Sequence, residues 1–131
     1  MVSPLQQRSY ELTLRVAGIS VHAHGGAECA RDIHRLLFSA AMDLGAWTER
    51  AAGAASRELF RAGLYEINVH VRLVKLWIRL LDDLGAVDPE AACPLHDLAE
   101  EIHRLCITAL RTARDIVPSN TEMRNGSAAV A

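Results

Sequence analysis

Residues 73–84 read LVKLWIRLLDDL and carry more apolar surface than one packing face of a helix can use. At about 100° per residue they form two adjacent apolar faces, with Leu73, Trp77, Leu80 and Leu84 on one and Val74, Ile78 and Leu81 on the other. Together the faces cover about 200° of the circumference, whereas a surface helix needs about 100°. Such a helix is either central in its own bundle or packs part of this arc against another subunit.

We expect the second arrangement, a homo-oligomer, because one packing face cannot use the whole arc. Large apolar side chains that become fully buried are the usual anchors of such contacts. The expected interface residues are Val74, Trp77, Ile78 and Leu81.

The composition is that of one helical domain. The 131 residues are 50% hydrophobic and only 5% aromatic, so a single core is filled by small aliphatic side chains. Apolar residues recur at helical spacing over 27–47, 57–84 and 94–116. The sequence does not decide whether the second of these helices is interrupted near Gly63. Gly85 is expected to close the middle helix, and Pro94 fits the first turn of the last one.

The N-terminal segment fits two structures. Tyr10, Leu12, Leu14 and Val16 alternate as in a strand, but the same stretch could form a short amphipathic helix. We predict an all-α fold, an antiparallel up-and-down four-helix bundle. Its expected parts are an N-terminal element at 1–27 that is either a strand or a helix, the helical bundle at 28–117 and a disordered tail at 118–131.

Charge and cysteine content exclude several classes of protein. The formal charge of -2 excludes nucleic-acid or membrane binding through bulk charge alone. No apolar stretch approaches the roughly 18 residues of a membrane span, and the N-terminus lacks a signal-peptide core, so we expect a cytoplasmic protein without membrane contact. Three cysteines without C-x-x-C spacing indicate neither a disulfide framework nor a zinc site.

The six histidines raise the question of a metal site. Glu100-x-x-His103 has the spacing used in di-iron four-helix bundles. However, this pair lies about 100° or more from the apolar stripe of its helix, and no second such motif occurs. We therefore expect no metal, no cofactor and no catalytic residue.

A polar pair lies inside the apolar arc of the middle helix. If that helix is continuous, Glu66 and His70 are one turn apart and buried together, and they fix the register of the helices. The alternative is a functional site in which His70 shares a proton with Glu66.

Basic residues between positions 57 and 80 are the best indication of a partner. They outnumber the acids of that stretch, and they are Arg57, Arg61, Arg72, Lys75 and Arg79. Arginine and lysine one turn apart can contact successive phosphates of RNA or DNA. The alternative is an ordinary solvated face.

Three segments carry a family resemblance: Ser56-Arg57-Glu58-Leu59-Phe60-Arg61, the run VKLWIRLL at 74–81 and the run LAEEIHRL at 98–105. Over roughly residues 30 to 115 the chain resembles the four-helix-bundle family of ribosomal intervening-sequence proteins and the accessory variability determinant of diversity-generating retroelements. The resemblance implies a cytoplasmic bundle that assembles as a pentameric ring. It also implies a reverse transcriptase and nucleic acid as partners of a basic surface.

The function expected from these observations is that of a non-catalytic oligomeric scaffold, or accessory protein, that binds a protein or nucleic-acid partner. The alternative is a small metal- or nucleotide-dependent enzyme of the helical-bundle class.

Overall fold

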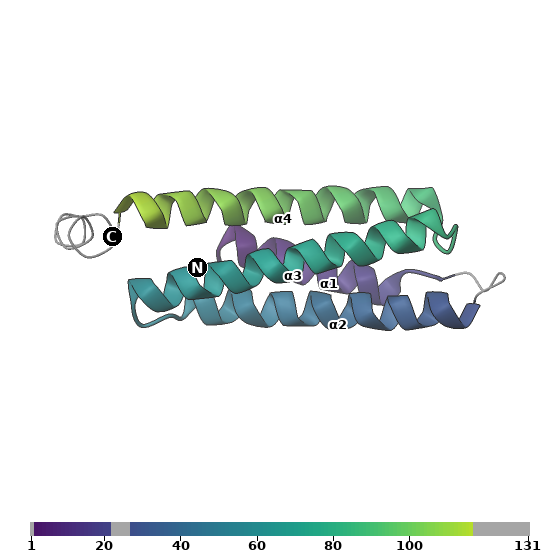
Figure 1. Cartoon of the computed structure of the whole chain (residues 1–131), viewed down its shortest axis with the longest axis horizontal. Helices are drawn as coiled ribbons and strands as arrows, with labels where there is room; N and C mark the ends of the chain where they lie inside the picture. Colours follow the sequence, from purple (N-terminus) through teal and green to yellow (C-terminus); the bar gives the residue numbers. More distant parts are fainter. Residues whose placement is uncertain (1, 22–26, 117–131) are drawn as a thin grey trace, which may run out of the picture.

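The computed structural model describes residues 2–21 and 27–116, which contain four α-helices and no strand. The helices are α1 (Pro4–Gly18), α2 (Ala27–Ala52), α3 (Arg57–Asp83) and α4 (Pro89–Ile116). Each helix packs against the next, and α4 also packs against α1, so the four form an up-and-down bundle (Figure 1). The predicted all-α bundle is confirmed. Its assembly into a ring stays a prediction, and the predicted tail at 118–131 lies outside the described residues.

The N-terminal segment forms the fourth helix of the bundle. Leu12 and Val16 are fully buried, whereas Tyr10 and Leu14 are exposed, so the buried positions follow the i, i+4 spacing of a helix. Ser3 caps α1, because its hydroxyl accepts the Gln6 backbone N–H at 3.2 Å while the Gln6 side chain accepts the Ser3 backbone N–H at 2.9 Å. The ambiguity of residues 1–27 is thereby resolved for Pro4–Gly18.

Helix α3 is continuous through Gly63, which is buried against α2. A Cβ atom added at Gly63 would lie 3.1 Å from the Cβ of Ala51 and 3.4 Å from its Cα. The glycine therefore permits the close approach of the two helix backbones.

The connection between α3 and α4 begins as predicted and ends earlier. Gly85 has a φ of 67° and donates to the Asp82 carbonyl, while Ala86 donates to the Leu81 carbonyl, as in a Schellman motif. Helix α4 then begins at Pro89, so the prediction that Pro94 opens it was wrong. Pro89 has the fixed φ suited to a first helical position, and Pro94 is accommodated at an exposed position inside the helix.

The core uses the residues that were expected at a subunit interface. Val74, Ile78 and Leu81 are at most 1% exposed within the single chain, so their apolar surface is consumed inside the bundle. Of the expected interface set, only Trp77 stays half-buried. Helix α3 packs against both α2 and α4, and this packing buries the face of the arc that holds Val74, Ile78 and Leu81, whereas Leu73 and Leu84 on the other face stay exposed.

Two glycine substitutions test the close approach at Gly63. In a helix interior, replacing glycine by alanine stabilises by about 1 kcal/mol. Gly45→Ala should raise the free energy of unfolding by most of this amount, because the new Cβ lies at an ordinary contact distance of 4.0 Å from the Thr13 hydroxyl. Gly63→Ala should gain nothing or lose stability, because overpacking against Ala51 costs about 1–3 kcal/mol. Urea unfolding measures both, and equal gains would contradict the close packing of α2 on α3.

Candidate nucleic-acid interface

The predicted basic residues lie along one side of α3. At about 100° per residue, the six positions 57, 61, 68, 72, 75 and 79 fall within about 60° of one another. This sector, which we call the basic stripe, holds Arg57, Arg61, Asn68, Arg72, Lys75 and Arg79. It adjoins α4, because the side chains of Asn68 and Lys75 contact residues of that helix. The predicted residues therefore share one edge of the bundle.

Four members of the basic stripe keep their charge free for a ligand. Arg57, Arg72 and Arg79 are exposed and Arg61 is half-buried. Within the described parts of the chain none of the four forms an ion pair, in contrast to Arg8, Arg15 and Arg35 of α1 and α2. A cation that is not neutralised internally can neutralise an external phosphate.

Lys75 differs from the arginines because α4 neutralises it. Its ammonium lies 2.5 Å from a carboxylate oxygen of Glu100 and donates to Nδ1 of His103 at 3.3 Å. His103 in turn donates from Nε2 to the Asn68 side-chain oxygen at 3.1 Å. These contacts assign His103 as the neutral tautomer with its proton on Nε2.

The pKa values of this polar cluster follow from its contacts. Partial burial, and then the adjacent Lys75 ammonium, hold the pKa of His103 below its ordinary value. The hydrogen bond from Lys75 lowers the pKa of Glu100. The cluster therefore favours an ionised Glu100 beside a neutral His103. Sequence reasoning placed Glu100 and His103 on the side of the bundle but missed Lys75 and Asn68 as their partners.

The predicted pair of Glu66 and His70 is not buried. Both residues are half-buried, and the His70 ring donates from Nδ1 to the backbone carbonyl of Glu66 at 2.7 Å. The ring contact therefore goes to the backbone of the preceding turn, whereas a shared proton would need the carboxylate. The pair lies away from the α4 side of the helix because its positions are about 150° or more from the centre of the basic stripe.

No group of three or more histidine, cysteine, aspartate or glutamate side chains converges as a metal site within residues 2–21 and 27–116. Cys106 is in the core and donates to the Leu64 carbonyl at 3.2 Å, and burial raises the pKa of its thiol to about 11. None of the four described helices is both long enough and apolar enough to cross a bilayer.

Comparisons of the chain with models of protein families, with curated proteins and with solved structures find no match. The resemblance to the intervening-sequence family therefore stays a prediction.

The neutral state of His103 predicts a pH dependence of stability. Its pKa is lower in the folded chain than the ordinary 6.5, so the folded state binds this proton less readily than the unfolded state does. The free energy that His103 contributes is fully present above about pH 6.5 and decreases as the pH falls toward the folded-state pKa. Glu100 stays ionised in this range, because its lowered pKa lies below 4.5.

Urea unfolding at about pH 7.5 and about pH 5.5 measures this effect. Wild type should lose more stability on acidification than His103→Gln, which has no titrating ring. Subtracting the two losses removes the contribution of the other histidines. An equal loss in both proteins would contradict the lowered pKa of His103.

Proposed function

We propose that this chain is a non-catalytic helical-bundle scaffold whose basic stripe binds the phosphate backbone of nucleic acid. The observation that carries the proposal is the row of four arginines on α3 without ion-pair partners in the described structure. Four guanidinium groups on one helix edge repel one another, and phosphate relieves this repulsion. The overall charge of -2 does not oppose such binding, because the local field acts over only about 8–10 Å at physiological salt.

The length of the stripe suits a backbone contact. From Arg57 to Arg79 it extends about 33 Å, at about 1.5 Å per residue. Each strand of double-stranded DNA carries one phosphate per about 3.4 Å of helix axis, so a row of arginines of this length can contact more than one phosphate. Contacts to phosphates position a nucleic acid without reading its bases, so we expect binding that is insensitive to sequence.

Self-association would multiply this weak site. With Val74, Ile78 and Leu81 in the core, the apolar surface left near the C-terminal end of α3 includes Leu73, Trp77 and Leu84, while Leu59, Tyr65 and Val69 are exposed earlier in the helix. Leu73 is 37% exposed and Leu84 is 54% exposed. We propose that copies of the chain associate through these residues, in a pentamer if the family resemblance holds. The same resemblance adds a reverse transcriptase as the proposed protein partner.

Three arginine substitutions test the nucleic-acid interface. Arg61, Arg72 and Arg79 are replaced together by glutamine, and binding of a fluorescent single-stranded RNA is followed by anisotropy at about 50 and 200 mM salt. Each lost phosphate contact lowers the slope of log affinity against log salt by about 0.7, so the triple variant should lose about 2 from the slope. Its affinity at the lower salt concentration should fall at least about tenfold.

A matched variant controls for the change in net charge. Arg15, Arg31 and Arg35 lie on α1 and α2, and two of them already pair with Glu11 and Asp32. Their joint replacement by glutamine should change the affinity less than about twofold. The proposal is wrong if wild type does not bind at low salt, or if both triple variants lose affinity equally.

A further inference from the structure

The fourth position of the bundle is only partly filled. Helix α1 has 15 residues, whereas α2, α3 and α4 have 26 to 28. Figure 1 shows that α1 begins part-way along the bundle. Its first turn lies at the level of Glu49, which accepts a hydrogen bond from the Gln6 side chain at 3.1 Å, and α4 continues to Ile116. One end of the bundle therefore has three helices around an open side.

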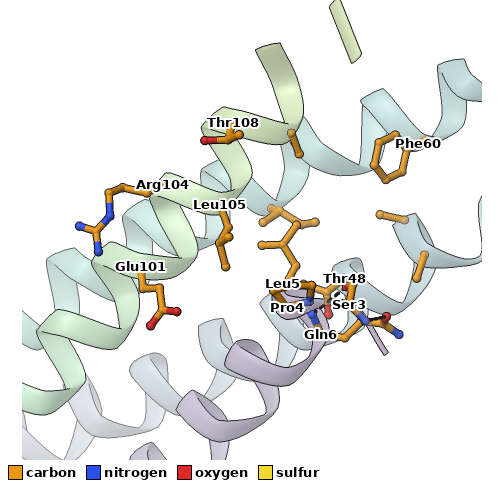
Figure 2. A pocket seen from close by; sticks show the side chains of 14 residues that line it. Ser3, Pro4, Leu5, Gln6, Thr48, Phe60, Glu101, Arg104, Leu105 and Thr108 are labelled. Atoms are coloured by element: carbon orange, nitrogen blue, oxygen red, sulfur yellow. Dashed lines mark hydrogen bonds between the residues drawn. The ribbon is translucent and has the colours of Figure 1, made fainter. Parts of the chain in front are cut away.

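This open side forms a groove of about 570 Å³. Its apolar lining comes from all four helices and includes Leu5, Ala51, Phe60, Ile67, Leu105 and Ala109. Figure 2 shows Leu5 and Leu105 between Phe60 on one edge and Glu101 and Arg104 on the other. A smaller hollow shares Phe60 and Ala109 and extends the groove to Ala113. The volume lies within the range of about 300–1,000 Å³ typical of small-molecule sites.

Most polar groups in the lining already have partners. Ser3 and Gln6 bind each other in the cap of α1, and the Thr48 hydroxyl donates to the Gly45 carbonyl at 2.7 Å. Glu101 accepts from Arg8 at 2.7 Å and is neutralised by it. These groups have little capacity left for a ligand.

Two polar side chains of the lining have no partner in the described chain. Arg104 and Thr108 are exposed, stand one turn apart on α4 and make no side-chain hydrogen bond or ion pair with other described residues. A guanidinium group and a hydroxyl at this spacing can both donate to one carboxylate. After the pairing of Glu101, the charge that the groove presents to a ligand is positive.

We propose that the groove binds an amphiphilic carboxylate, an unbranched apolar chain with one terminal carboxyl group. Arg104 and Thr108 hold the carboxylate, and the chain lies along Leu105, Ala109 and Phe60. The lining of α4 runs from Glu101 to Ala113, about 18 Å along the helix, which favours a long narrow ligand over a compact one. Arg57 of the basic stripe lines the smaller hollow, but Arg104 and Thr108, which hold the carboxylate, lie outside the stripe, so the proposal does not depend on nucleic-acid binding.

Isothermal titration calorimetry with decanoate and decanol tests the proposal. Wild type should bind decanoate at one saturable site per chain and decanol more weakly. Arg104→Gln should weaken decanoate binding about tenfold and leave decanol binding unchanged. Arg111→Gln removes the same charge from an exposed position of α4 outside the groove and should leave decanoate binding unchanged.

A filled groove provides the second test. Ala109→Phe places a ring where the chain should lie and should abolish the binding of both ligands, with circular dichroism confirming that the variant is folded. Arg104→Gln changes an exposed side chain, so it tests the proposal even if Ala109→Phe does not fold. The proposal is overturned if wild type shows no saturable decanoate binding, if Arg104→Gln and Arg111→Gln weaken it equally, or if a folded Ala109→Phe binds normally.

Discussion

The burial of one side of α3 within a single chain fixes the orientation of this helix and of its charged edge. Seven residues of this helix are buried, and Leu64, Ile67, Val71, Val74, Ile78 and Leu81 are at most 1% exposed. Full burial of each such side chain contributes about 1.5–3 kcal/mol, whereas an exposed ion pair contributes about 1 kcal/mol or less. The core therefore determines how α3 is rotated about its axis, and the arginines occupy the edge that this rotation leaves beside α4.

Contacts with the neighbouring helices then determine which arginines and lysines remain available to bind a ligand. Glu100 of α4 neutralises Lys75 and His103 accepts a hydrogen bond from it, but neither forms a hydrogen bond or ion pair with any of the four arginines. The short helix α1 has a comparable effect at the other edge of α4. There Arg8 neutralises Glu101, and Arg104 stays unpaired among the described residues. Both proposed sites thus contain cations that lie next to an ion pair of the bundle but are not part of it.

The sequence predicted the helices well because their signals are local. The cap at Gly85 needs only a glycine after an apolar run, and the structure has the expected positive φ there. The strand-like alternation of Leu12 and Leu14 was ambiguous because Leu12 and Val16 satisfy both periods. The Ser3–Gln6 capping box is a local signal for a helix that our reading of the sequence missed. Pro94 was a misleading signal, because a proline at an exposed position can be accommodated inside a long helix.

Contacts between helices could not be predicted from the sequence, because they depend on how separate helices are placed relative to one another. The wide apolar arc of α3 indicated that much of this helix is buried. It did not indicate whether α2 and α4 or a second subunit would bury it. The contact of Asn68 with His103 depends on how far α4 slides along α3, and no pattern within either helix specifies that register. The groove beside Leu5 results from a difference in helix length, and it becomes visible only when the helices are placed side by side.

The edge of α3 that this rotation leaves exposed is the surface that we propose contacts phosphate. Nuclear magnetic resonance of the arginine Nε–Hε groups, titrated with a short single-stranded RNA at low salt, tests it most directly. We expect the signals of Arg57, Arg61, Arg72 and Arg79 to shift together and to return to their original positions when salt is added, while those of Arg15 and Arg35 stay in place. Equal shifts of arginines on all helices, or shifts confined to α1 and α2, would contradict it.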